Sequence, residues 1–77
     1  MDDYLVAIHD KWLDLDQRKF DCFMRGDRGR FEELTQRQMG LEEAVRVYVQ
    51  YRGLDNAQTV KYMIAFKNNN KLHLEYR

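Results

Sequence analysis

Three successive runs in the second half of the chain alternate apolar and polar side chains with a period of two, and this feature constrains the fold most. Successive side chains of a β-strand point to opposite faces, so each run predicts a strand with one apolar and one polar face. The short polar connections at 54–58 and 68–70 predict hairpin loops. The sequence therefore predicts a three-stranded antiparallel β-meander. Its inward-facing residues would be Val45, Val47, Val49 and Tyr51, then Val60, Tyr62, Ile64 and Phe66, then Leu72, Leu74 and Tyr76.

The N-terminal part of the chain has helical periodicity instead. Asp2 or Asp3 is expected to cap a first helix, and Gly26 is expected to end it in the left-handed conformation. A broad apolar stripe through Trp12 should pack on the core. A second apolar strip on the same helix is expected to cover another helix or a second copy of the protein. That strip consists of Val6, Leu13, Phe20 and Met24.

The predicted fold class is α+β, with two N-terminal helices packed on the three-stranded antiparallel β-meander in the order α-α-β-β-β. Residues 1–77 are expected to form a single small domain, with a helical part at about 3–39 and a sheet part at about 44–77. Within the helical part, the second helix is expected to be short, over 29–38, and to stop at Gly40.

An all-α fold is the alternative, because residues 41–52 also fit a helical stripe. Three valines and two tyrosines between positions 45 and 51 favour a strand, since β-branched and aromatic residues are enriched in strands. If 41–52 and 55–67 were helices, the pair would form a helix-turn-helix whose second helix enters a DNA major groove. That helix would present Asn56, Gln58, Thr59 and Lys61.

The small size of the protein predicts that it associates with another chain. A domain of 77 residues buries a thin core, and its one cysteine, Cys22, leaves no disulfide to add stability. A homodimer or an obligate partner is therefore expected. A lone thiol also favours a reducing compartment, and the sequence shows no signal peptide and no membrane-spanning run. These features predict a cytoplasmic protein.

The polar face of the predicted sheet is basic. The chain has 13 basic and 13 acidic residues, and this neutral balance argues against indiscriminate binding to nucleic acids or membranes. The alternation nevertheless places every Lys and Arg after Gly40 on one face, which predicts a surface for a protein partner that is itself acidic. Two alternatives are a nucleic acid, whose phosphates the cations would contact and whose bases would stack on Tyr48, and a surface that is only solvated. The predicted partner-binding residues are Arg46, Tyr48, Gln50, Arg52, Lys61, Met63, Lys67, Lys71, His73 and Arg77.

No pattern in the sequence predicts catalysis, a cofactor or a metal site. His9 and Cys22 would project in different directions from one helix, so they form no thiol–imidazole pair. Cys22 is expected to be buried and His9 to lie on the surface, and no Cys or His spacing matches a zinc site. The sequence predicts a non-enzymatic regulator, adaptor or inhibitor that binds another macromolecule, of a kind that phages and mobile elements also encode. A nucleic-acid-binding module is the alternative function.

Overall fold

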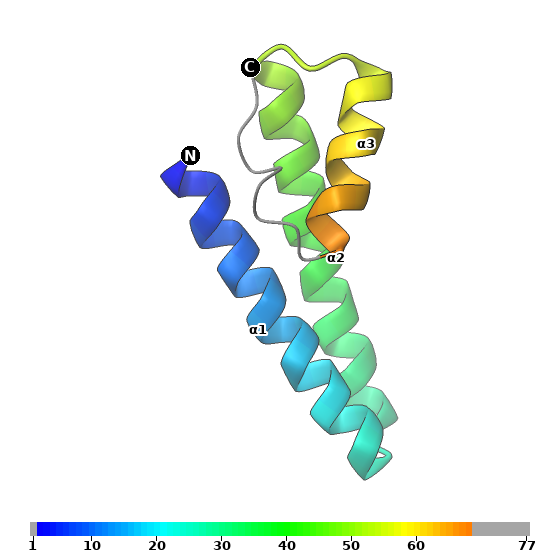
Figure 1. Cartoon of the computed structure of the whole chain (residues 1–77). Coiled ribbons are helices and arrows are strands. Elements are labelled where there is room, and N and C mark those ends of the chain that lie inside the picture. The colour runs from blue at the N-terminus through cyan, green and yellow to red at the C-terminus, as the bar shows by residue number, and fades with distance from the viewer. Residues whose placement is uncertain (1, 69–77) are drawn as a thin grey trace.

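The computed structural model describes residues 2–68, and within that range it contains three helices and no strand (Figure 1). Helix α1 is Asp3–Arg25, α2 is Arg28–Tyr51 and α3 is Asn56–Lys67. The two long helices α1 and α2 form an antiparallel hairpin, and α3 turns back beside the second half of α2 (Figure 1). The predicted strand at 71–77 lies outside the described residues.

The prediction for α1 is confirmed. Asp2 is the N-cap, and its Oδ1 accepts hydrogen bonds from the backbone N–H groups of Tyr4 at 2.9 Å and Leu5 at 3.3 Å. Gly26 ends the helix with a φ of 74°, a left-handed conformation that glycine adopts without steric cost. Local capping signals therefore located both ends of this helix correctly.

The α+β fold class and the β-meander are wrong over the described residues, because both runs that were expected to be strands there are helical. In α2, Val45 and Val49 are buried while Val47 and Tyr51 are exposed. Residues two apart on a helix point in nearly opposite directions, whereas residues four apart share a face. The alternating run therefore divides into a buried pair and an exposed pair, and the all-α alternative fits the structure.

The same division occurs in α3. Its buried residues Thr59, Tyr62, Met63 and Phe66 follow the spacing i, i+3, i+4, i+7 of one helical face. Val60 and Ile64, which were expected on the apolar face of a strand with Tyr62 and Phe66, are exposed on the other side. A capping box at Asp55 begins the helix, because its carboxylate accepts from Gln58 N at 2.8 Å and Gln58 Oε1 accepts from Asp55 N at 2.9 Å.

Helix α2 does not stop at Gly40, so the prediction of a short helix over 29–38 is also wrong. A continuous buried stripe, Leu34, Gln38, Val45 and Val49, passes the glycine on the face toward α1. Glycine in a helix interior costs about 1 kcal/mol relative to alanine, which is less than the burial of this stripe contributes. Packing against α1 therefore keeps the helix intact through Gly40.

The core has two parts, because α3 covers only one end of the hairpin. The larger cluster joins all three helices and consists of Leu5, Trp12, Val45, Val49, Tyr62, Met63 and Phe66. The smaller cluster, Leu15, Cys22 and Leu34, lies between α1 and α2 alone, toward the turn that connects them. Trp12 and Cys22 are buried, as predicted. Across residues 2–68, no helix combines the length and apolar character that crossing a bilayer requires.

Candidate protein-binding surfaces

The predicted partner-binding residues do not form one face of a sheet, but four of them line a groove between α2 and α3. The groove has a volume of about 350 Å³, and the four residues are Arg46, Gln50, Met63 and Lys67. Val60 and Ile64, which are 58% and 57% exposed, lie beside them. This groove is thus mixed in character, with an apolar wall from α3 and two cations.

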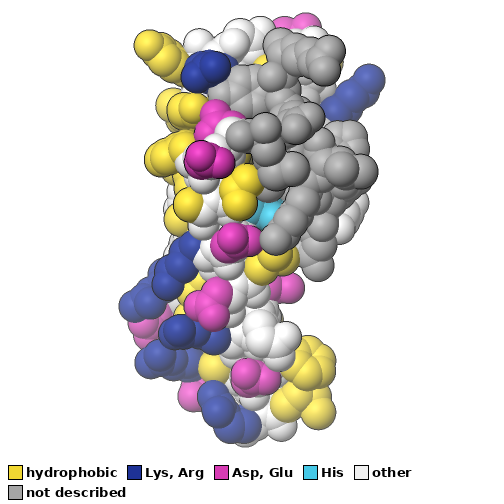
Figure 2. All heavy atoms as spheres, turned by 60° about the vertical axis from the view of Figure 1, so that its left-hand side comes forward, with side chains coloured by type: hydrophobic (Ala, Val, Ile, Leu, Met, Phe, Trp, Pro, Cys, Tyr) yellow, Lys and Arg dark blue, Asp and Glu magenta, His cyan; other side chains and the backbone are white. Residues whose placement is uncertain are grey.

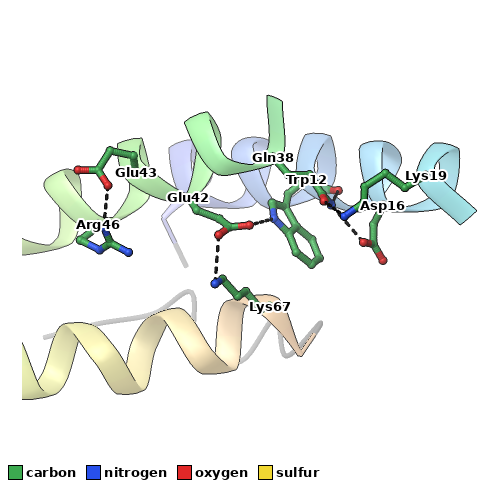
Figure 3. Close-up of polar contacts among 8 residues, drawn as sticks. All are labelled: Trp12, Asp16, Lys19, Gln38, Glu42, Glu43, Arg46 and Lys67. Atoms are coloured by element: carbon green, nitrogen blue, oxygen red, sulfur yellow. Dashed lines mark hydrogen bonds and ion pairs between the residues drawn. The ribbon is translucent and has the colours of Figure 1, made fainter. Parts of the chain in front are cut away.

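Both cations of the α2–α3 groove already have carboxylate partners. Arg46 Nη1 donates to Glu43 Oε2 at 2.6 Å, and Lys67 Nζ lies 3.1 Å from Glu42 Oε1 (Figure 3). An acidic partner at this groove would have to compete with two carboxylates of the protein itself. The groove is therefore a weaker site for an acidic ligand than the alternating sequence indicated.

The remaining predicted residues lie elsewhere. Tyr48 packs against α1, where its Oη donates to Asp2 Oδ2 at 2.7 Å and its ring centroid lies 4.9 Å from that of Tyr4. The Arg52 guanidinium carbon lies 6.0 Å from the centre of the Tyr48 ring. Lys61 is exposed on α3. Lys71, His73 and Arg77 lie outside the described residues.

The residues proposed for a DNA-reading helix are not all available. Thr59 is buried, and its hydroxyl donates to Asp55 O at 2.7 Å. Gln58 is held in the capping box, and the Asn56 Oδ1 accepts from Gln50 Nε2 at 3.1 Å. Only Lys61 remains with neither burial nor a hydrogen bond within residues 2–68.

A polar network marks the boundary between the part of the hairpin that α3 covers and the part that it leaves open (Figure 3). Trp12 Nε1 donates to Glu42 Oε2 at 2.9 Å, and the same carboxylate holds Lys67 at the end of α3. One turn further toward the hairpin connection, Gln38 Nε2 donates to Trp12 O at 3.2 Å and to Asp16 Oδ1 at 3.1 Å. Lys19 Nζ donates to Gln38 Oε1 at 2.9 Å. Beyond Lys19, nothing in the described chain covers the hairpin.

Three large apolar side chains are exposed in this uncovered part: Phe20 at 58%, Phe23 at 70% and Met24 at 67%. Phe23 and Met24 follow Phe20 by three and four positions on α1, so both lie on the same side of the helix as Phe20. Figure 2 shows hydrophobic side chains gathered at the lower end of the molecule, with Lys and Arg side chains on the opposite edge. Phe20, Phe23 and Met24 together expose roughly 400 Å² of apolar surface, which is within the size range of surface patches that are often functional. We call these three residues the apolar patch.

An open cleft of about 440 Å³ continues the apolar patch inward. Phe23 forms one wall, Phe31 of α2 forms the other, and the buried Cys22 lies between them. Lys19 Nζ lies 5.1 Å from the centre of the Phe31 ring and closes the side toward the polar network. This apolar cleft is large enough to receive one aromatic or branched side chain of another molecule.

A second, polar cleft of about 260 Å³ lies beside the same turn. Its lining includes Arg18, Arg25 and Arg30, together with Asp21 and Leu34. The lining residues of the two clefts have only Cys22 in common. Since Cys22 is buried between α1 and α2, the polar cleft and the apolar cleft lie on opposite sides of the hairpin.

Sequence reasoning missed this end of the hairpin as a site, although one signal pointed to it. The second apolar strip on α1 was expected to cover another helix or a second copy of the protein. Its first two members, Val6 and Leu13, are half-buried beside the larger core cluster. Its last two, Phe20 and Met24, are exposed because no described helix reaches them.

The buried polar side chains within residues 2–68 are His9, Gln38 and Thr59. His9 was expected on the surface, but it is fully buried, and its Nε2 donates to Phe66 O at 3.0 Å. That prediction is wrong, because α3 covers this part of α1. Among the described residues, no group of three or more His, Cys, Asp and Glu side chains could hold a metal ion. Cys22 is buried as a free thiol.

Comparison of the chain with protein-family models, with curated proteins and with solved structures found no match.

Proposed function

We propose that the protein is a non-enzymatic regulator, adaptor or inhibitor that binds another protein through the free end of the α1–α2 hairpin. The observation that carries this proposal is the apolar patch, Phe20, Phe23 and Met24, which continues into the cleft between Phe23 and Phe31. Exposing three large apolar side chains together at the end of a small domain is unfavourable in water unless another molecule covers them.

The composition of this surface supports a protein partner. Aromatic residues, Met and Arg are enriched in protein–protein interfaces, and binding energy concentrates in a few such anchors beside a pocket. The patch lies on a helix that the smaller core cluster, Leu15, Cys22 and Leu34, holds against α2. Because the helix is already ordered in the free protein, binding a partner here would cost little conformational entropy of the backbone.

The proposed site of action is the cytoplasm, which the lone cysteine supports. A second copy of the chain is a competing occupant of the same patch. Sedimentation of the purified protein over a range of concentrations distinguishes the two, because self-association through the patch would be lost in Phe23→Ala. A dimer that dissociates in this variant would assign the patch to self-association and contradict the proposal of a separate partner.

The proposal is tested with two double variants, each of which truncates two exposed apolar side chains to alanine, one at the end of the hairpin and one in the α2–α3 groove. The tip variant carries Phe20→Ala and Phe23→Ala, and the control carries Val60→Ala and Ile64→Ala in the α2–α3 groove. A partner captured by the unchanged protein is purified and its affinity for each variant is measured by calorimetry. We expect the tip variant to lose at least about thirtyfold in affinity, as hot-spot residues do, and the control to lose less than about threefold.

Circular dichroism of each variant provides the folding control, since all four side chains are more than half exposed. A partner that binds the tip variant as tightly as the unchanged protein would contradict the proposal. If only the control variant failed to bind the partner, the binding site would lie in the α2–α3 groove instead.

A further inference from the structure

The second half of α2 carries an apolar stripe on its solvent-facing side. Gly40, Ala44, Val47 and Tyr51 follow one another by four, three and four positions, which is the spacing of a coiled-coil seam, so they lie on one face of the helix. All four residues are exposed, Val47 to 58% and Tyr51 to 83%. We call these four residues the outer seam.

The outer seam points away from both neighbours of α2. Helices α1 and α3 lie on either side of the second half of α2 (Figure 1). Arg46 and Gln50 border the seam toward α3, where they line the α2–α3 groove, and Tyr48 borders it toward α1. The buried Val45 and Val49 face the core from the opposite side of the helix. Within the described chain, the outer seam therefore faces solvent.

Gly40 is not explained by the contacts of its own chain. It lies in the interior of α2, where glycine is less favourable than alanine, and within the described chain nothing beyond its own helical turn lies within 4 Å of an added Cβ. Glycine on a helix face allows another molecule to approach the backbone closely. Gly40 and Ala44 make the outer seam low at one end, whereas Val47 and Tyr51 project from it at the other.

We propose that the outer seam binds the outer seam of a second copy of the chain in antiparallel orientation, which gives a two-fold symmetric dimer. This inference does not depend on the proposed function above. A two-fold axis midway along the seam places Tyr51 of each copy over Gly40 of the other, and Val47 over Ala44. Each large side chain then meets a small one, as close packing of two helices requires.

The charges beside the outer seam are compatible with this pairing. In an antiparallel dimer of this symmetry, the same edges of the two helices adjoin. On the edge toward α3, Arg46 and Glu43 are paired at 2.6 Å, and Glu43 would lie within about 3 Å, measured along the helix axis, of Arg46 of the second copy. This edge is therefore neutral. On the other edge, Arg37 comes level with the region of Arg52 of the second copy, but its charge is already paired with Glu33 at 3.2 Å.

The length of the outer seam limits the strength of the dimer. The seam covers about three helical turns, or roughly 16 Å. Stable complexes bury about 800 Å² on each partner, which is more than one helix face of this length offers. We therefore expect a dimer that exchanges with the monomer, with a dissociation constant in the micromolar range or weaker. The antiparallel arrangement leaves both hairpin ends free and directs them away from each other.

The test is sedimentation equilibrium of the full chain from low micromolar to millimolar concentration, with a matched pair of variants. Val47 and Val60 are both 58% exposed, on α2 and α3 respectively. Val47→Glu places a carboxylate in the apolar contact and should raise the dissociation constant at least about tenfold, whereas Val60→Glu should change it less than about twofold. Phe23→Ala should leave the dimer unchanged, and circular dichroism confirms that each variant is folded.

Gly40→Ala distinguishes the dimer contact from the stability of the helix. At dilutions where the chain is a monomer, this variant should melt at a higher temperature than the unchanged protein, because alanine favours a helix. The added methyl group lies where the Tyr51 ring of the second copy would pack, so the dissociation constant should rise at least about threefold.

Disulfide formation tests the orientation. A mixture of a Gly40→Cys chain and a Tyr51→Cys chain should form an inter-chain disulfide on oxidation, because these positions face each other. The Tyr51→Cys chain alone should not, since its two copies of position 51 would lie about 16 Å apart along the helix axis. The native Cys22 is buried and does not compete.

Several results would overturn the inference. They are a chain that remains monomeric at millimolar concentration, a dimer that neither Val47→Glu nor Gly40→Ala weakens, and a disulfide between two Tyr51→Cys chains. Loss of the dimer in Phe23→Ala would place self-association at the apolar patch instead, and would contradict the proposal of a separate partner as well. If the outer seam fails while Phe23→Ala leaves the oligomeric state unchanged, the proposed function still stands.

Discussion

Replacing Phe66 by alanine should remove most of what holds α3 on the hairpin. Phe66 is fully buried, and its ring centroid lies 4.7 Å from that of His9 and 5.7 Å from that of Trp12, both on α1. Truncating a buried Phe to Ala costs about 3–5 kcal/mol, from lost burial and from the cavity that remains. A domain of this length has a free energy of unfolding of about 4–12 kcal/mol, so the variant should lose a large part of its stability.

Urea denaturation measures this loss with two probes. Far-ultraviolet circular dichroism follows all three helices, while the fluorescence of Trp12, the only tryptophan, follows the contact with Phe66. If α3 detaches before the hairpin unfolds, the fluorescence transition of the variant should occur at lower urea than the dichroism transition. The matched control is Ile64→Ala on the exposed side of the same helix, which should change stability by less than about 0.5 kcal/mol.

Two outcomes would refute this reasoning about α3. A loss below about 1 kcal/mol in Phe66→Ala would mean that the contacts of its ring contribute little to stability. An equal loss in Ile64→Ala would mean that the opposite face of α3 carries the packing.

Three further predictions concern local features of the fold. Gly26→Ala should destabilise the protein by about 1–2 kcal/mol because of its left-handed φ, whereas Gly40→Ala, with nothing within 4 Å of the added Cβ, should stabilise it by about 0.5–1 kcal/mol; thermal melts of the two variants should shift in opposite directions. Asp55→Ala removes the capping box of α3 and should cost about 1 kcal/mol in urea denaturation, while Asp55→Asn should retain most of the cap. Burial raises the pKa of the Tyr62 hydroxyl above its ordinary value of 10.0, and the negative charge of Asp2 adds to the rise. Unfolding therefore releases a proton above that pH, so stability should fall as the pH rises past about 10, and Tyr62→Phe should show a smaller fall in urea titrations at about pH 9 and 11.

Features that depend on neighbouring residues alone could be predicted from the sequence. The N-cap at Asp2 and the left-handed Gly26 located α1. The burial of Trp12 also followed from its place in a helical stripe. These signals act within a few residues, so no knowledge of the tertiary structure was needed.

The candidate site was predicted only in part. Arg46, Gln50, Met63 and Lys67 do lie together, because positions three or four apart on α2 and α3 face the same groove. The two cations of this groove, Arg46 and Lys67, are paired with the carboxylates of Glu43 and Glu42. The predicted strands did not indicate these ion pairs. Two members of the apolar patch, Phe20 and Met24, belong to the second apolar strip predicted on α1, but that strip did not include Phe23.

Sequence alone determined where α1 begins and ends and which of its faces is apolar, because capping and helical periodicity are local. Only the tertiary structure decided the state of residues 41–67, because residues 41–52 fit a strand by composition and by alternation and also fit a helical stripe. Packing against α1 favours the helix, since it buries Val45 and Val49 together. The tertiary structure also decided what stays uncovered: α3 has 12 residues and packs beside the second half of α2, so Phe20, Phe23 and Met24 are left in contact with solvent.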